Sequence, residues 1–306
     1  MTNVYRIHLK PSAAEGYNHK DIVDFCKEEG IVGVGWSAVT TRSYDNAVLR
    51  NELSGYPPKS VALGYQSIRC MRNMEVNDLV WTQFDKTYYL CRVTQKWVDR
   101  DEPTEKYLDF DVPNYVRCEW IKVGEQWEVP GGVIRSLMWS TPVQNVNNVE
   151  GISKKIWNAK SPKESYKYKI EGKDTDVWNL LGPEEVEEIV MLYLQVVEGY
   201  KVHTSAVKRT TPDVEGVLVD TEGNKAYPQV KSGSSICLDA KDYYDKFISK
   251  DPKAKVYLFA DSQRYSNDNY ENVICLKKDD IEDFIRNYKH MFLEKTRLWI
   301  SMSNFK

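Results

Sequence analysis

The spacing of apolar residues is most regular in the last third of the chain, where it predicts a helix over residues 183–197. Apolar residues recur there at i, i+3, i+4, i+7 and i+11, which places them on one face of an α-helix. This stripe consists of Val186, Ile189, Val190, Tyr193 and Val197. Pro183 suits the first helical position, and the acidic Glu184 and Glu185 suit the first turn. Gly199 is expected to end the helix.

The chain after this helix contains runs of β-branched and aromatic residues, which are typical of strands. Three strands are expected, at residues 200–204, 213–219 and 225–231. The turn residues 221–224 separate the last two strands and allow them to pair antiparallel. A helix at residues 239–249, strands at 256–260 and 273–276, and a helix at 279–291 complete the region. The order α-β-β-β-α-β-β-α predicts a mixed sheet with helices on its faces.

The first half of the chain is predicted to be mixed, with much β-structure. Short strands are expected at residues 4–9, 31–36 (a buried strand or a turn), 78–82, 88–94 and 116–121. The third and fourth of these form a hairpin, a helix over residues 21–27 ends near Gly30, and Gly131-Gly132 marks a turn. The chain is therefore divided into a β-barrel-like domain at residues 1–145, a polar Asn- and Lys-rich linker at 146–178, and a mixed α/β domain at 179–306.

Composition and charge narrow the function classes. The 306 residues suffice for two domains, and no run of about 18 apolar residues predicts a membrane span. The N-terminus lacks the apolar segment of a signal peptide, so the protein is expected in the cytoplasm, without a membrane partner. The six cysteines form no C-x-x-C pair, which argues against a zinc site.

Any contact with nucleic acid must come from local basic patches, because the net charge is −3. One such patch lies in and next to the predicted linker. It consists of Lys154, Lys155, Lys160, Lys163, Lys167 and Lys169. The patch is compatible equally with a solvated linker and with an arm that contacts phosphates.

Two acids and a Gln-x-Lys pair form the candidate chemical site. Alternate residues of a strand share a face, so Asp213 and Glu215 are expected to point the same way. Gln229 and Lys231 are expected to share a face of the next strand. If the two strands pair antiparallel, the four side chains converge at one end of the sheet.

Such a site suits a divalent metal ion and phosphodiester cleavage. Mg²⁺ prefers oxygen ligands, and Asp213, Glu215 and the main-chain carbonyl of Val230 supply them. Lys231 is expected to orient the attacking water or to stabilise negative charge on the phosphate. Glu187 lies at the edge of the apolar stripe of the helix, where it is expected to contact the metal through water.

These residues resemble the PD-(D/E)XK nuclease superfamily, in particular its Mrr-type branch with Gln-x-Lys in place of Glu-x-Lys. The matching segments are residues 187–190, Gly199-Tyr200, residues 213–216 and residues 229–233. The resemblance implies Mg²⁺- or Mn²⁺-dependent cleavage, usually of DNA. An Asp-Gly pair is frequent in the family where this chain has Glu215-Gly216, so the resemblance leaves open whether Asp213 or Glu215 is the principal ligand.

The N-terminal half contains many aromatic residues, most of which are expected in the core. The segments around Trp36, Trp81 and Tyr89 resemble PUA-like and EVE-like β-barrels, which often hold modified bases. The resemblance makes these three side chains candidates for a pocket that accepts a base flipped out of a duplex. Gly33 and Gly35 do not form a G-x-G-x-x-G pattern, which argues against a dinucleotide site.

The sequence therefore predicts a modification-dependent restriction endonuclease or a related anti-phage effector that acts on DNA, with modified cytosine as the candidate target. One active site cuts one strand, so double-strand cleavage predicts a homodimer. Two alternatives remain open. The nuclease could be activated by a small molecule or a protein signal, or the nuclease fold could have degenerated into a nucleic-acid-binding module.

Overall fold

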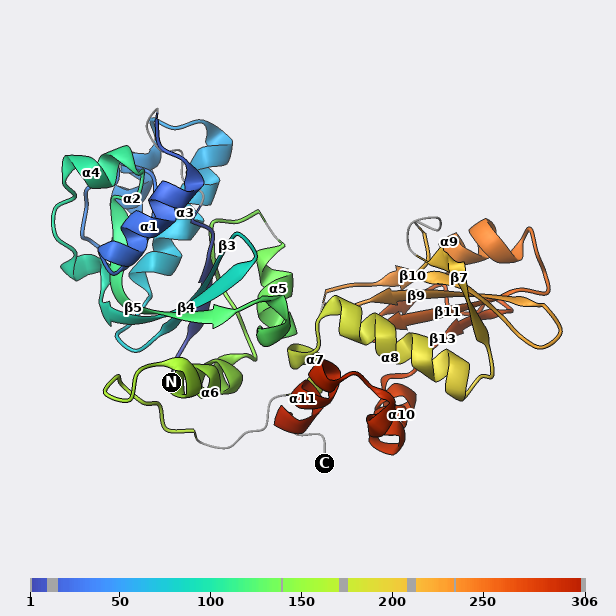
Figure 1. The fold of residues 1–306 in the computed structure, drawn as a ribbon. Helices are drawn as coiled ribbons and strands as arrows, with labels where there is room; N and C mark the ends of the chain where they lie inside the picture. The colour runs from blue at the N-terminus through green and yellow to red at the C-terminus, as the bar shows by residue number, and fades with distance from the viewer. Residues whose placement is uncertain are drawn as a thin grey trace. The chain divides into compact units, whose positions relative to one another are not determined.

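The computed structural model describes residues 2–9, 16–138, 140–170, 176–207, 213–233 and 235–303, with the side chains of residues 204–207 left out. The chain divides into two compact units, Met1–Thr175 and Asp176–Lys306 (Figure 1). Both units mix helices and strands. No helix within the described ranges is long and apolar enough to cross a membrane.

The first unit is built on a six-stranded mixed sheet that curls into a half-barrel. Its strands are β1 (Val4–Ile7), β2 (Ile31–Val34), β3 (Leu79–Phe84), β4 (Thr87–Gln95), β5 (Asn114–Gly124) and β6 (Val143–Asn145). They lie in the order β2-β5-β4-β3-β1-β6, and β1 pairs with β3 in parallel while the other pairs are antiparallel. The predicted strands are confirmed, whereas the PUA- or EVE-like identity of the sheet remains a prediction.

The predicted hairpin is confirmed, with a tighter turn than expected. The register of β3 and β4 runs to Phe84 opposite Thr87, which leaves a loop of two residues. Those residues, Asp85 and Lys86, have φ angles of 43° and 62°. Positive φ at both positions is the requirement of a type I′ turn, whose twist matches that of the flanking strands.

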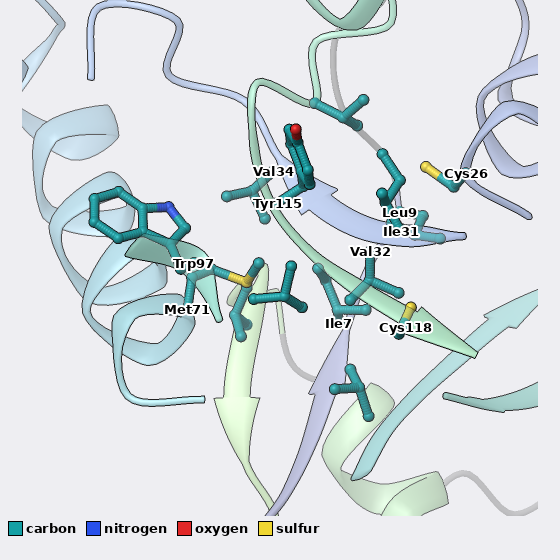
Figure 2. Packing of buried hydrophobic residues seen from close by; sticks show 14 of the residues in the cluster. Ile7, Leu9, Cys26, Ile31, Val32, Val34, Met71, Trp97, Tyr115 and Cys118 are labelled. Carbon is teal, nitrogen blue, oxygen red and sulfur yellow. The ribbon is translucent and has the colours of Figure 1, made fainter. Parts of the chain in front are cut away.

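Helices cover the core of this unit. They are α1 (His19–Glu28), α2 (Asn46–Leu53), α3 (Pro58–Arg72), α4 (Glu105–Asp109), α5 (Gly131–Leu137) and α6 (Glu150–Lys160), with 3-10 turns at Trp97–Asp99 and Gln126–Glu128. Asn18 caps α1, and the Asp21 carboxylate accepts a hydrogen bond from the Asn18 N–H. Figure 2 shows residues from sheet and helices packed into one apolar cluster, including Ile7, Cys26, Val32, Met71, Trp97 and Cys118.

Gly131-Gly132 does not form the expected turn, because α5 begins at Gly131. Val133 is fully buried and Ile134 nearly so, and the helix packs against β1. Burial of these apolar side chains outweighs the low helix propensity of the two glycines.

Part of the predicted linker is an ordered helix of the first unit. Ile152, Ile156 and Trp157 of α6 are buried, and the helix packs against β5. Part of the basic patch is engaged within this unit, since Lys154 forms an ion pair with Glu150 and Lys160 forms one with Glu128. The sequence showed no helical period here because the buried face is short and lysines surround it.

The second unit is built on a five-stranded sheet in the order β13-β11-β9-β8-β7. The strands are β7 (Lys201–Val207), β8 (Gly216–Val219), β9 (Lys225–Lys231), β11 (Lys255–Ala260) and β13 (Val273–Cys275). The pairs β7–β8 and β8–β9 are antiparallel, and β11 is parallel to both β9 and β13. A separate two-stranded sheet joins β10 (Leu238–Asp239) to β12 (Tyr265–Ser266). The predicted mixed sheet is confirmed.

The helices of this unit are α7 (Val177–Leu180), α8 (Pro183–Val196), α9 (Ala240–Tyr243), α10 (Lys278–Tyr288) and α11 (Glu294–Met302). A π-helical turn, Tyr244–Ile248, continues α9. Helix α8 lies against β9 and α10 packs against α8, while α9 lies on the other side of the sheet (Figure 1). The predicted stripe of α8 is buried except for Val197, which caps the helix and is exposed.

We expect Trp157→Ala to lower the free energy of unfolding by about 3–5 kcal/mol, because the side chain is fully buried and its loss leaves a cavity. Trp127→Ala is the matched control, since that side chain is 47% exposed and its loss should change stability little. Urea unfolding followed by circular dichroism measures both. Equal effects in the two variants would contradict the packing of α6.

Candidate functional site

Gln229 and Lys231 lie on β9, between β8 and β11. They are alternate residues of one strand and so share a face, as predicted. Gln229 is buried, whereas the Lys231 side chain is 50% exposed at the carboxyl end of the strand. The site therefore extends along β9 from the buried Gln229 to the half-exposed Lys231.

Glu215 joins these two side chains. The Gln229 Nε2 donates a hydrogen bond of 3.1 Å to the Glu215 Oε1, and the Lys231 Nζ lies 3.9 Å from the same oxygen. The main-chain N–H of Glu215 donates to the carbonyl of Pro228, at 2.9 Å. Of the four side chains that were expected to converge, those of Glu215, Gln229 and Lys231 do so.

Asp213 does not share a strand face with Glu215, and that expectation was wrong. Strand β8 begins at Gly216, so both acids precede it. The register pairs Leu218 with Ala226, and two further steps bring Gly216 opposite Pro228. Proline has no N–H to donate to β8, so the ladder is interrupted where the two acids begin.

The carboxylate of Asp213 is instead bound by a lysine of the π-helical turn. The Lys246 Nζ lies 2.8 Å from the Asp213 Oδ1, and both side chains are about half exposed. An exposed pair of this kind is weak and can exchange partners. Asp213 thus lies beside the site without contributing a ligand in this arrangement.

The acidic side chains of α8 differ in their burial and in their partners. Glu187 is half-buried, and its predicted water-mediated contact with a metal remains a prediction. Glu188 accepts a hydrogen bond of 3.0 Å from the Thr296 hydroxyl of α11. Glu185 is buried and forms an ion pair with Lys295. Two of these acids therefore hold α11 against α8.

Two further residues lie at the site that the sequence interpretation did not select. Burial raises the pKa of Tyr243 on α9, and the carboxylates of Asp242, Asp213 and Glu215 raise it further. Tyr243 is therefore a neighbour of both candidate acids.

The second is Asp261, whose N–H donates to the Lys231 carbonyl at 3.3 Å and whose Oδ1 accepts from the Gly233 N–H at 2.7 Å. It fixes the chain just after Lys231. An acid directly after the apolar strand at residues 255–260 was a usable signal, because the carboxyl ends of neighbouring parallel strands meet at one edge.

The oxygen donors at the site fit a hard divalent cation. Glu215 provides a buried carboxylate, Gln229 an amide, and the carbonyl of Val230 lies 3.4 Å from the Gln229 Nε2. Mg²⁺ is commonly bound through one or two carboxylates and keeps several waters. No group of three or more His, Cys, Asp and Glu side chains in the described ranges is placed to hold a metal ion, so most ligands would have to be water, amide or carbonyl.

The predicted base-pocket residues of the first unit occupy different environments. Trp81 is fully buried and its indole N–H donates to Ser153, at 3.0 Å, so it belongs to the core and not to a pocket. Trp36 is partly buried and donates to Ser60. A Cβ atom on Gly64 would lie 2.6 Å from the Trp36 indole nitrogen, so this ring lies directly on α3.

Tyr89 lies next to an open hollow of about 360 Å³. Its ring contacts Trp120 edge-on at 5.7 Å, and its hydroxyl accepts a hydrogen bond of 3.1 Å from the Lys27 Nζ. Lys27, Trp120 and Trp157 are among the residues that line the hollow. Its volume falls within the roughly 300–1,000 Å³ of small-molecule sites. Trp120 and Trp157 were not among the predicted pocket residues.

No protein-family model, curated protein or solved structure matches this chain. The chemistry of the site therefore has to be argued from its geometry and from the sequence motifs.

We expect Gln229→Ala to destabilise the second unit by about 1–3 kcal/mol, because it removes a buried donor from the Glu215 carboxylate. Lys246→Ala breaks an exposed ion pair and should cost under about 1 kcal/mol. Chemical denaturation of the two variants beside the wild type measures the difference. A Gln229→Ala variant as stable as Lys246→Ala would show that the buried hydrogen bond is not formed.

Proposed function

We propose that residues 179–306 hydrolyse phosphodiester bonds in DNA with Mg²⁺ or Mn²⁺, and that residues 1–145 select the DNA. The convergence of Glu215, Gln229 and Lys231 at one end of a mixed sheet carries the proposal. It places a buried carboxylate close to a half-exposed ammonium group. Binding of a metal cation beside a phosphate requires such a pair.

Each residue has a distinct role in this proposal. Glu215 and the Val230 carbonyl would hold the metal, which when bound would polarise the phosphate and acidify a water. Gln229 orients the carboxylate of Glu215 through its hydrogen bond. Lys231 places a positive charge where negative charge develops on the phosphate. Asp261 positions the chain that follows Lys231.

The resemblance to Mrr-type PD-(D/E)XK nucleases supports the same reaction. It matches this chain at residues 213–216 and 229–233, and the short distances among Glu215, Gln229 and Lys231 are compatible with one shared site. They favour Glu215 over Asp213 as the principal ligand. Cleavage of both strands of a duplex would then require two copies of the chain.

For the first unit we propose that the hollow beside Tyr89 accepts a modified cytosine flipped out of the duplex. Trp120 offers an aromatic surface for stacking, and Lys27 and Glu119 offer a donor and an acceptor. Modification-dependent restriction or anti-phage defence is the activity that combines such a reader with a nuclease.

We expect Lys231→Ala and Glu215→Ala each to lower the rate of plasmid cleavage in Mg²⁺ by about 100-fold or more, because each removes charge from the reacting centre. Lys225→Ala is the matched control: it lies on the same strand, is exposed, and pairs with Asp251 away from the site. Wild-type rates in the Lys231→Ala variant would overturn the assignment.

The reader is tested with plasmids that contain cytosine, 5-methylcytosine or 5-hydroxymethylcytosine. We expect one modified plasmid to be cut preferentially, and Trp120→Ala to remove the preference without removing cleavage, because Trp120 lies in the other unit from the nuclease residues. Equal cutting of all three plasmids would refute the reader and keep the nuclease. Failure of the folded protein to cut any of them would favour a binding module or a missing activator.

A further inference from the structure

Two arginines are buried against one tryptophan in the first unit. Arg72, the last residue of α3, is 2% exposed, and Arg100, which follows Trp97–Asp99, is 4% exposed. The guanidinium carbons of Arg100 and Arg72 lie 4.0 Å and 5.2 Å from the ring centroid of Trp97. The ring is therefore covered by cations and not by apolar side chains alone.

Polar atoms without partners are concentrated at this place. Within the described part of the chain, five buried atoms of these residues and Glu52 accept or donate no hydrogen bond. They are the Arg72 Nε and Nη2, the Arg100 Nε, the Trp97 Nε1 and the Glu52 Oε2. More than about 90% of buried polar groups in proteins are partnered, so a cluster of exceptions indicates a missing ligand or solvent.

The carboxylates that act on the two buried arginines are less buried than the arginines themselves. Glu52 is the carboxylate that acts on both arginines. Burial lowers the pKa of Arg100 to about 10 and also lowers that of Arg72, yet both remain charged at neutral pH. Asp45 is exposed and caps α2, and Glu102 forms an exposed ion pair with Arg42. The two buried guanidinium groups thus share one partly buried carboxylate, and their other acidic neighbours are exposed. A buried charge without a close partner is costly.

Residues 40–45 cover the cluster with main-chain atoms. The Arg100 Nη2 donates to the Thr41 carbonyl at 3.3 Å, and the Arg72 Nη1 donates to the Asp45 carbonyl at 3.5 Å. Both distances exceed the usual 2.7–3.2 Å of such bonds. The segment has no helix or strand and is exposed apart from Thr41, which is half-buried. Its two carbonyls stand where the oxygens of an anion would make stronger bonds.

We propose that Arg72 and Arg100 bind the phosphate group of a small phosphate ester, such as a nucleoside monophosphate, in place of residues 40–45. Guanidinium groups bind phosphate through paired, charge-assisted hydrogen bonds. A phosphate has more charge and more acceptor oxygens than a carboxylate, which matches two arginines and the Trp97 N–H. The free oxygen of Glu52 accepts a hydroxyl or amino group of the same ligand.

Calorimetry of the full chain with AMP, inorganic phosphate and a short unmodified oligonucleotide tests the site. We expect AMP to bind, and both Arg72→Lys and Arg100→Lys to weaken binding by about tenfold or more, because lysine keeps the charge but loses the paired donors. Arg69→Lys, on the exposed face of α3, is the matched control. Circular dichroism establishes that each variant is folded.

A second measurement reports on the covering segment. Arg42 makes residues 40–45 a trypsin site, so displacement by AMP should speed cleavage after Arg42 while sites in the second unit keep their rates. Failure of AMP to bind the wild type, or equal binding by both Arg→Lys variants, would overturn the proposal. Binding of the oligonucleotide but not of AMP, lost in the same variants, would also overturn it and assign the cluster to a nucleic-acid backbone.

Discussion

The missing N–H of Pro228 is the constraint on which the candidate active site depends. Pro228 occupies a central strand, where proline is rare because the N–H of each residue normally donates to a neighbouring strand. Its carbonyl is still bound by the Glu215 N–H, but the ladder with β8 ends there. The chain before Gly216 is therefore free to leave the sheet plane. Glu215 lies against Gln229, and Asp213 lies out at Lys246.

This constraint also explains how far the sequence could predict the site. Strand alternation placed Gln229 and Lys231 correctly, because β9 is regular through Lys231. Strand alternation failed for Asp213 and Glu215, because it applies only to residues within a strand and β8 begins after both of them. The proline that ends the ladder stands on the partner strand, so its effect appears only when the register of β8 and β9 is known.

The fold, too, was predictable where a local pattern specifies an element and not where tertiary contacts do. Helix α8 and the hairpin of β3 and β4 were predictable, because a local pattern fully specifies each of them. Helix α3 was not predicted, because its buried face contains Gly64, Ser67 and Arg72 beside Ile68 and Met71. A small residue is required where Trp36 lies on the helix, and an arginine where the charge cluster forms. Tertiary contacts select these residues, and no hydrophobic period marks them.

The two units differ in how their buried polar groups are satisfied. At the candidate active site, Gln229 partners the Glu215 carboxylate before any ligand binds, so that part of the site is preorganised. Around Trp97, in contrast, two arginines retain free donors, and their bonds to residues 40–45 are long, although Arg100 also donates to the Trp97 carbonyl at 3.1 Å. A preorganised site is stabilised little by rearrangement. A cluster of buried cations with unpartnered donors, in contrast, is stabilised when an anion binds. Ligand-dependent rearrangement is therefore expected at the arginine cluster of the first unit and not at the sheet edge of the second.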